Sequence, residues 1–442
     1  MTRLLVLSGL LLLAFPAAVA AQGTEGGGTE LSITSFDPES ATAPTSGVEG
    51  RGIKIGEGTV IHPVFGVSTG LVSNVFYEDT DALAGGVIRL FAQIGAGSLS
   101  SARLTPSNPG AGAEEFNAGS FQYRASLRAS YDFMLSGNDN VSAQGGLGLG
   151  ATLRGFTNPT GTWSFGFDEN FVRLIRATNF ETDSDTNRDI NTLGLNLIYH
   201  PRGRSMSGYL YYHNTIDIFE RSTQEFADRL QHRFGIHPMW RVLPQTVIFA
   251  DISQGIYGGL GDSMKVDSYP FVAQAGIGTL LTPNATVNVH AGYTNGFYSS
   301  GPSYSSVTAG VQLGYRYNPL GRAALTYDLK YEDSVNANYY RDHVVRLLLQ
   351  QMIVPFTVMV QPEIHFRQYN GITVVNGPPT RNDVIYSIIA GAHYNFRNSL
   401  AVGLDYRFSA VQTDYRYMAV GGEVDDPSFV RHQLLLGMRW AL

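Results

Sequence analysis

Cysteine is absent from this sequence, charged residues are few, and acidic residues outnumber basic ones. The chain of 442 residues has no Cys, which excludes disulfide bonds, cysteine-based metal sites and a lipid anchor on an amino-terminal cysteine. Charged residues make up 15% of the chain, whereas soluble domains average about 25%. The net charge of -7 argues against a nucleic-acid partner, because such partners need a basic surface.

Long apolar runs are also absent after the amino terminus, while glycine and aromatic residues are abundant. No later stretch reaches the roughly eighteen apolar residues that mark a transmembrane helix. The chain has 50 Gly, 24 Tyr and 24 Phe. Little charge with many rings and much glycine suits strands that have one face toward lipid and the other toward a crowded lumen.

The first residues have the organisation of a secretory signal peptide. Arg3 supplies the positive charge, residues 4–15 form a mostly apolar core, and small residues at 18–21 precede Gln22. Residues 22–59 are rich in Gly, Thr, Ser and Glu and have no sustained apolar pattern. We therefore predict a signal peptide at 1–21, a flexible periplasmic segment at 22–59 and a transmembrane barrel at 60–442.

A turn signal recurs after residue 60 at intervals of about forty residues. The signals are Pro109-Gly110, Asn158-Pro159-Thr160-Gly161, Pro201-Arg202-Gly203, Leu243-Pro244, Thr282-Pro283-Asn284, Asn318-Pro319-Leu320-Gly321, Val354-Pro355 and Asn395-Phe396-Arg397-Asn398. Such an interval accommodates two long strands, one tight turn and one longer loop, which is the hairpin unit of a transmembrane β-barrel. Nine such units from about Ile61 predict an all-β fold, a single antiparallel barrel of about eighteen strands.

Residues between the turn signals alternate between apolar and polar, as strands with two different faces do. Residues 121–133, 141–153 and 356–366 follow this pattern. The first is longer than the roughly 5–6 residues of an ordinary strand, which favours a barrel over a β-propeller. The alternation slips near Glu169, within 163–176, and predicts a bulge or a wrong boundary there.

The chain ends in an alternating strand that resembles the carboxy-terminal targeting strand of bacterial outer-membrane barrels. Its apolar positions are Leu434, Leu436, Met438, Trp440 and Leu442. The resemblance implies recognition by the barrel assembly machinery and a periplasmic carboxy terminus. All eight turn signals then fall on the periplasmic side, with longer loops outside. One long connection, at 369–383, is expected to be a mobile surface loop, with an inward-folded constriction loop as the alternative.

Arginines recur at positions that alternation assigns to the lumen. They are Arg124, Arg128, Arg154, Arg233, Arg316, Arg346, Arg367, Arg407 and Arg439. One interpretation is a positive track for anionic solutes or acidic polysaccharide. The other is structural pairing with lumen acids, for which the candidates are Asp132, Asp328, Glu332, Glu363 and Asp405.

Catalytic and metal-binding patterns are weak in this sequence. His213-Asn214-Thr215 is a poor match to the site of a barrel phospholipase, and His232 and His237 are five residues apart rather than four. We therefore expect no catalytic residues, no metal and no cofactor. A barrel enzyme of the phospholipase or protease type remains the disfavoured alternative.

Aromatic residues near predicted strand ends are expected to form girdles at the membrane interfaces. They are Tyr209, Tyr211, Tyr212, Trp240, Tyr293, Phe297, Tyr315, Tyr317, Tyr394, Phe396, Tyr406 and Phe408. The alternative is a stacking path for sugar rings, which only inward-facing rings could form.

Several segments resemble the β-barrel porin 2 family of outer-membrane proteins. They are His62-Pro63-Val64-Phe65-Gly66, Ser73-Asn74-Val75-Phe76-Tyr77, Asn191-Thr192-Leu193-Gly194-Leu195, the stretch 209–220 and Trp240-Arg241-Val242-Leu243-Pro244. The resemblance implies an outer-membrane channel in lipid and lipopolysaccharide, passing hydrophilic solute or secreted exopolysaccharide, with a periplasmic export protein as a candidate partner. A general diffusion porin and a closed structural or adhesive barrel are the alternatives.

Overall fold

The computed structural model describes residues 52–55, 59–98, 121–158, 161–175, 187–201, 205–372, 378–396, 399–418 and 424–442. The predicted signal peptide, most of segment 22–59 and the Pro109-Gly110 signal lie outside these ranges. Within them, no helix is both long and apolar enough to cross a membrane.

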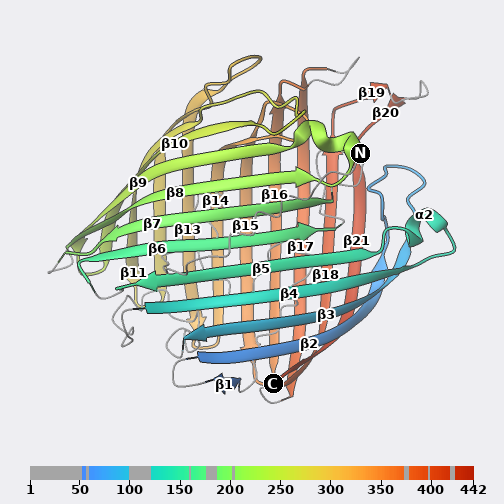
Figure 1. Cartoon of the computed structure of the whole chain (residues 1–442), viewed down its shortest axis with the longest axis horizontal. Coiled ribbons are helices and arrows are strands. Elements are labelled where there is room, and N and C mark those ends of the chain that lie inside the picture. Colours follow the sequence, from blue (N-terminus) through green and yellow to red (C-terminus); the bar gives the residue numbers. More distant parts are fainter. Residues whose placement is uncertain are drawn as a thin grey trace.

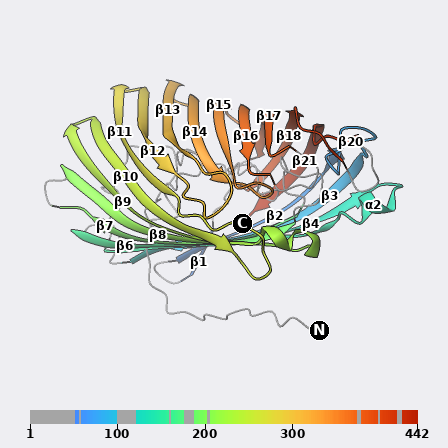
Figure 2. The ribbon, with the colours of Figure 1, turned by 90° about the horizontal axis from the view of Figure 1, so that it is seen from above.

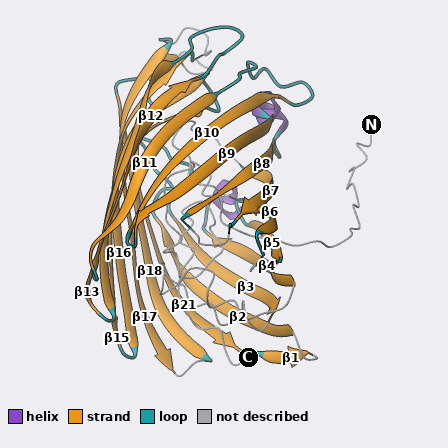
Figure 3. Ribbon diagram, turned by 90° about the vertical axis from the view of Figure 1, so that its left-hand side faces the viewer, coloured by secondary structure: helices purple, strands orange, loops and turns teal. Residues whose placement is uncertain are grey.

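Strands make up nearly all of the described chain (Figure 3). The strands are β1 (Ile53–Ile55), β2 (Thr59–Val72), β3 (Gly85–Ser98), β4 (Phe121–Leu135), β5 (Gly146–Thr157), β6 (Trp163–Leu174), β7 (Arg188–Tyr199), β8 (Met206–Phe219), β9 (Arg229–Leu243), β10 (Thr246–Gly259), β11 (Phe271–Thr282), β12 (Ala285–Asn295), β13 (Ser305–Asn318), β14 (Gly321–Asp333), β15 (Tyr339–Ile353), β16 (Phe356–Asn370), β17 (Thr380–Phe396), β18 (Leu400–Thr413), β19 (Tyr417–Met418), β20 (Val424–Asp425) and β21 (Phe429–Ala441). The helices are α2 (Asp139–Ser142) and the 3-10 helix η2 (Ser222–Ala227).

Eighteen of these strands, β2–β18 and β21, form one closed antiparallel barrel. Each pairs with its neighbours in sequence, and β21 closes the barrel by pairing with β2, from Val64 opposite Ala441 to Val72 opposite Gln433. β2–β9 make one wall and β11–β18 the opposite wall (Figure 2). The strands of the two walls cross at a steep angle (Figure 1). The predicted fold and strand number are confirmed.

The tight connections all lie at one end of the barrel, which we call the turn end. Residues 244–245, 283–284, 319–320 and 354–355 each join two strands in two residues. All turn signals within the described residues lie at this end, as predicted. The carboxy terminus is there too, where Leu442 donates its backbone N–H to Pro63 at 3.1 Å. The opposite end, the loop end, carries longer connections such as 73–84, 220–228 and 260–270.

Alternation holds along the strands that the sequence predicted most clearly. In β4, Leu127, Tyr131 and Phe133 are 58%, 43% and 45% exposed, whereas Ser130 and Asp132 between them are buried. β16 shows the same alternation between exposed Phe366 and buried Arg367. The strand predicted over 141–153 was wrong at its start, because Val141 lies in helix α2 and β5 begins at Gly146. Asn138 caps that helix by accepting from the backbone N–H groups of Asn140 and Val141.

No bulge occurs in β6, but the alternative, a wrong boundary, is borne out, because the strand predicted over 163–176 ends at Leu174. β6 pairs without a register shift with β5 from Arg173 to Phe165 and with β7 from Trp163 to Leu174. The apparent slip arises because Glu169 occupies an outward position, where it accepts from Asn191 Nδ2 at 2.6 Å. In the sequence, this hydrogen-bonded outward carboxylate looks like a shift of the apolar–polar alternation by one residue.

Strand β1 lies within the segment predicted to be flexible. Ile53, Lys54 and Ile55 pair with residues 59–61 of β2. Gly52 donates its backbone N–H to the carbonyl of Leu442 at 3.0 Å. The start of the chain's described part is therefore fixed beside the strand that closes the barrel.

Candidate functional site

Register assigns each strand residue to the inner or the outer face of the barrel. Large exposed apolar side chains gather on one face, which includes Leu127, Phe234 and Leu436. Side chains of the other face bridge strands that are not neighbours, as when Tyr211 on β8 donates to Asp251 on β10 at 3.0 Å. Such bridging fits the concave face, which is therefore the inner one.

The register places all nine predicted arginines on the inner face. Arg124 lies directly opposite Arg154, which lies opposite Asp168, and Arg346 lies opposite Glu363. Their ion pairs include those of Arg154 with Asp168, Arg346 with Glu363 and Arg367 with Asp342. Another, Arg233, donates to the Tyr257 hydroxyl at 2.7 Å.

The inner face carries more basic than acidic strand residues. The basic ones are Arg89, Arg124, Arg128, Arg154, Arg188, Arg229, Arg233, Arg241, Arg316, Arg322, Lys330, Arg346, Arg367, Arg381, Arg407, Arg431 and Arg439. The acidic ones are Asp132, Asp168, Asp217, Asp251, Asp328, Glu332, Asp342, Glu363, Asp383 and Asp405. The inner wall is therefore cationic although the whole chain has a net charge of -7.

The densest group of these charges lies on β15 and β16. His365 lies between two carboxylates, with Nδ1 2.9 Å from Asp342 and Nε2 2.6 Å from Glu363. Arg367 also donates to Asp342, at 2.7 Å, and Arg346 pairs with Glu363. Both imidazole nitrogens can donate to carboxylates only in the protonated ring, so this arrangement suits an imidazolium.

Most of the acids that were proposed to pair with the nine arginines bind an arginine, a lysine or a histidine. Asp132 pairs at 2.6 Å with Arg89, which is not among the nine predicted arginines. Glu332 binds Lys330 at 2.5 Å, and Asp405 lies 3.1 Å from His393. Alternation could have found Arg89, since it lies within the regular strand β3 opposite Ser68 and Asp132.

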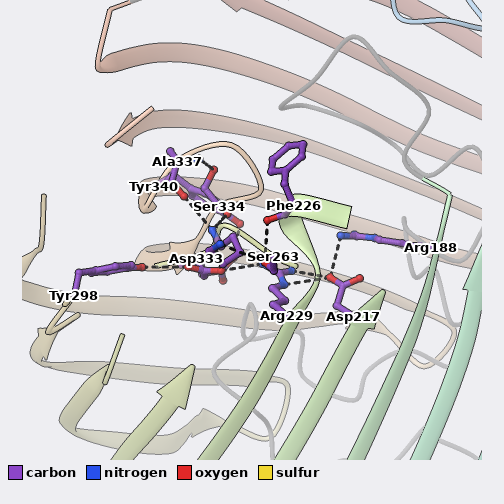
Figure 4. Close-up of polar contacts among 12 residues, drawn as sticks. Arg188, Asp217, Phe226, Arg229, Ser263, Tyr298, Asp333, Ser334, Ala337 and Tyr340 are labelled. Atoms are coloured by element: carbon purple, nitrogen blue, oxygen red, sulfur yellow. Dashed lines mark hydrogen bonds and ion pairs between the residues drawn. The ribbon is translucent and has the colours of Figure 1, made fainter. Parts of the chain in front are cut away.

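At the loop end, a chain of charged contacts links strands on different parts of the barrel (Figure 4). Arg188 on β7 and Arg229 on β9 both bind Asp217 on β8, at 3.3 and 2.9 Å. Arg229 also reaches Asp333 at the end of β14, at 3.3 Å. Since β9 and β14 are not neighbours, this contact joins separate parts of the rim.

Connection 260–270 is held into this network by Lys265. Its ammonium group pairs with Asp333 at 3.3 Å and donates to the carbonyls of Ser334 and Ala337, and its side chain is only 8% exposed. Tyr298 donates to Asp333 from a third connection, at 3.4 Å. Burial and the Asp333 carboxylate both raise the pKa of Tyr298 well above its ordinary value, so its hydroxyl keeps the proton that it donates.

Backbone hydrogen bonds join the same connections. Met264 donates its N–H to Phe226 O at 3.0 Å, and Ser299 donates to Asp267 O at 2.8 Å. Asn338 Nδ2 donates to the carbonyls of Ser300 and Pro302 at 2.9 and 3.0 Å. We call residues 220–228, 260–270, 296–304 and 334–338 the mouth network.

Connection 73–84 covers another part of the loop end, and it contains a segment on which the family resemblance rests. Asn74 is 1% exposed and donates to Glu78 O and Val430 O. Tyr77 packs against the inner-face residues Ile385, Val411 and Phe429. Arg431 donates to the Tyr77 hydroxyl at 2.6 Å and lies 4.5 Å from its ring centroid.

The long connection predicted at 369–383 is shorter in the structure. Tyr369 and Asn370 belong to β16 and Thr380–Asp383 to β17, so the connection is 371–379, and residues 373–377 are not described. Described contacts between separate parts of the loop end come from 73–84 and the mouth network, and the choice between a surface loop and a constriction loop for 373–377 lies outside the described residues. A lysine in a connection has no periodic signal, so sequence alternation could not find Lys265.

Most of the proposed girdle aromatics are on the outer face. Of the twelve, the register places Tyr209 and Tyr211 inward, and both are buried. Trp163, Trp240 and Trp440 are 54%, 55% and 49% exposed, and all three lie on the outer face near the turn end. A sugar-stacking path along most of the twelve residues is therefore inconsistent with their placement.

Within the described ranges, no group of three or more His, Asp or Glu side chains is placed to hold a metal ion.

Comparison with known proteins finds similar chains only among solved structures. No protein-family model and no curated protein sequence matches the chain. OccK2 (OpdF) of Pseudomonas aeruginosa is 11% identical, over 86% of this chain and 98% of that chain, with a TM-score of 0.43. OccAB3 of Acinetobacter baumannii is 13% identical, over 88% of this chain and 100% of that chain, with a TM-score of 0.41.

A porin of Rhodopseudomonas blastica is 11% identical, over 86% of this chain and 100% of its own, with a TM-score of 0.31. These likenesses are too distant to support a function, and the barrel assignment rests on this chain's own strand pairing. Membership of the porin 2 family stays a prediction.

Proposed function

We propose that this protein is an outer-membrane channel through which small hydrophilic anions diffuse. The excess of basic side chains on the inner face, in a chain whose overall charge is negative, carries the proposal. Charges that line a lumen set which ions enter it. Barrels of about 16–18 strands are wide enough for an aqueous path.

The outer face supports the membrane location. It carries most of the large exposed apolar side chains, and its tryptophans lie near the turn end, as aromatic residues at a membrane interface do. In this proposal the turn end faces the periplasm and the strand Leu434–Leu442 is read by the assembly machinery. The chain itself performs no catalysis.

The mouth network favours small solutes over a polymer. Its ion pairs join β9 to β14, and Lys265 anchors a connection between them. A secreted polysaccharide would have to pass this set of contacts. These contacts therefore argue against export of exopolysaccharide, which the family resemblance implied.

Ion selectivity in planar bilayers tests the proposal. With a KCl gradient across the bilayer, the zero-current potential should show a preference for chloride. The double variant R124Q/R154Q removes two inner-face charges from directly opposite positions, one of them 53% exposed, and should reduce that preference. The control R173Q removes an outward arginine and should leave it unchanged.

A preference for potassium, or identical potentials for wild type and R124Q/R154Q, would contradict anion passage. If no current were observed, even in a variant such as K265M that loosens the mouth network, the alternative of a closed structural barrel would be favoured.

A further inference from the structure

Three tyrosine–histidine pairs recur on the outer face of the barrel. The Tyr212 hydroxyl lies 2.9 Å from His232 Nδ1, that of Tyr327 lies 3.0 Å from His343 Nδ1, and that of Tyr406 lies 2.9 Å from His432 Nδ1. Their ring centroids are 6.1, 6.3 and 6.2 Å apart. The proposed channel uses none of these groups.

The three pairs share one geometry although they lie in different hairpins. Each tyrosine is six residues after the first residue of its strand, β8, β14 or β18. Each histidine is on the neighbouring strand, β9, β15 or β21, two residues closer to the loop end than the residue directly opposite the tyrosine, as His232 is relative to Phe234. The tyrosine therefore approaches each ring from the turn-end side.

The partners of His232 show which of its nitrogens carries the proton. Asn214 Nδ2, which can only donate, lies 3.2 Å from Nδ1 and also donates to the Gln231 carbonyl. Nδ1 must therefore accept, from Asn214 and from the Tyr212 hydroxyl. The proton of the neutral ring is then on Nε2, on the far side of the ring from the tyrosine.

Because the three pairs share one geometry, His343 and His432 are given the same tautomer as His232, and no Nε2 of the three rings has a hydrogen-bond partner within the described residues. The structure gives His232, His343 and His432 only the Nδ1 contacts above and ring stacking as side-chain interactions. A donor that faces hydrocarbon without an acceptor is unfavourable. An acceptor must therefore come from outside the chain.

The level of the pairs identifies that acceptor. His232 and His432 precede the interfacial Trp240 and Trp440 by eight residues. Tilted strands rise about 2.5 Å per residue along the membrane normal, so the histidines lie about 20 Å above the turn-end aromatics, near the other edge of an apolar band about 25 Å tall.

We propose that the three pairs are binding sites for the phosphate groups of lipid A in the outer leaflet. Each tyrosine holds the imidazole so that Nε2 donates toward the headgroup, where a phosphate oxygen is the strongest acceptor. The inference rests on the membrane location and orientation in the proposed function, and it is independent of solute passage.

Native mass spectrometry of the full-length protein in detergent micelles tests the proposal. The probes are bisphosphorylated lipid A and the same lipid A without its phosphates. Wild-type protein should bind the phosphorylated lipid more tightly. The variant H232F/H343F/H432F, which keeps a planar aromatic ring but removes both ring nitrogens, should bind it about tenfold more weakly at each site.

A second variant isolates the positioning role of the tyrosines. Y212F/Y327F/Y406F removes only the hydroxyls and should weaken binding less, since the imidazole remains but is no longer oriented. Tyr131→Phe is the matched control, because Tyr131 is an exposed outer-face tyrosine paired with no histidine, and its binding should equal that of wild type. Heat-dependent gel mobility checks that each variant is folded.

Equal binding by wild type and a folded histidine variant would overturn the proposal, as would equal affinity for the two lipids. Channel conductance should be unchanged in both triple variants. If the wild-type protein showed no conductance, the proposed function would be contradicted, but the result on lipid A binding would not be affected.

Discussion

Lys265 joins two connections of the loop end through buried polar contacts. It brings an almost fully buried ammonium group from connection 260–270 to Asp333 and to two carbonyls of connection 334–338. Arg229 and Tyr298 reach the same carboxylate from two further elements. One carboxylate thus organises three connections and β9.

Replacing Lys265 with Met should loosen the mouth network. The variant K265M keeps the aliphatic stem but loses the ion pair and both hydrogen bonds, while Asp333 retains Arg229. We expect a loss of about 1–3 kcal/mol in the free energy of unfolding and a higher single-channel conductance. K54M, at an exposed lysine of β1, is the control. Unchanged conductance in K265M would show that the network does not narrow the path.

Asp342 is the critical acid of the inner wall. It is 0% exposed and accepts from His365 and twice from Arg367. Asp342→Asn should lower the free energy of unfolding by about 3–5 kcal/mol, because it leaves buried positive charge without a counter-ion. Urea unfolding in lipid vesicles measures this. Asp262→Asn, at an exposed loop position, should change it by less than about 0.5 kcal/mol, and a similar effect of both would refute the assignment.

The faces of single residues were predictable from sequence, but their partners were not. Alternation put Arg346 and Glu363 on one face, and the register makes them direct neighbours. Nothing in the sequence indicated that Asp132 would pair with Arg89 or that Asp342 would bind Arg367. Those choices depend on which strands adjoin and in what register, which one chain's periodicity does not contain.

At the scale of elements, β6 shows how a local pattern can mislead. Outward Glu169 and inward Val172 and Leu174 break the apolar alternation, yet the ladder is regular on both sides. Toward the loop end the inner face also contains apolar clusters, such as Val172 with Leu174. A rule that places apolar residues outward works only along the membrane-spanning part of each strand.

The seam between β2 and β21 requires a glycine at position 70. A Cβ added to Gly70 would lie 1.7 Å from the backbone oxygen of Leu434, whereas one added to Gly278 would meet nothing within 4 Å. We therefore expect Gly70→Ala to prevent closure and to abolish the heat-sensitive fast-migrating band on gels, and Gly278→Ala to retain it. A normal folded fraction for the first variant would show that the seam can shift.

At the scale of the whole molecule, turn spacing predicted the number of strands and that the tight turns share one end of the barrel. Both depend on the regular length of the hairpins. A hairpin that crosses a membrane has a nearly fixed length, so turns such as Leu243-Pro244 recur at a nearly fixed interval. The covering of the loop end depends on long-range contacts such as Arg431 with Tyr77, which no interval encodes. The excess of basic side chains on the inner wall could be counted only from the closed barrel, because its register fixes which face of each strand points inward.

The position of the barrel in a membrane can be measured with its own tryptophans. The chain has three, and all lie on the outer face near the turn end, about half exposed. If this end is at an interface, lipids brominated near the headgroup should quench their fluorescence more than lipids brominated near the chain ends. Trp163→Phe should reduce the signal without changing this ratio, since the remaining two lie in the same belt. Stronger quenching by the deep bromines would place the turn end within the hydrocarbon and contradict the assigned membrane position.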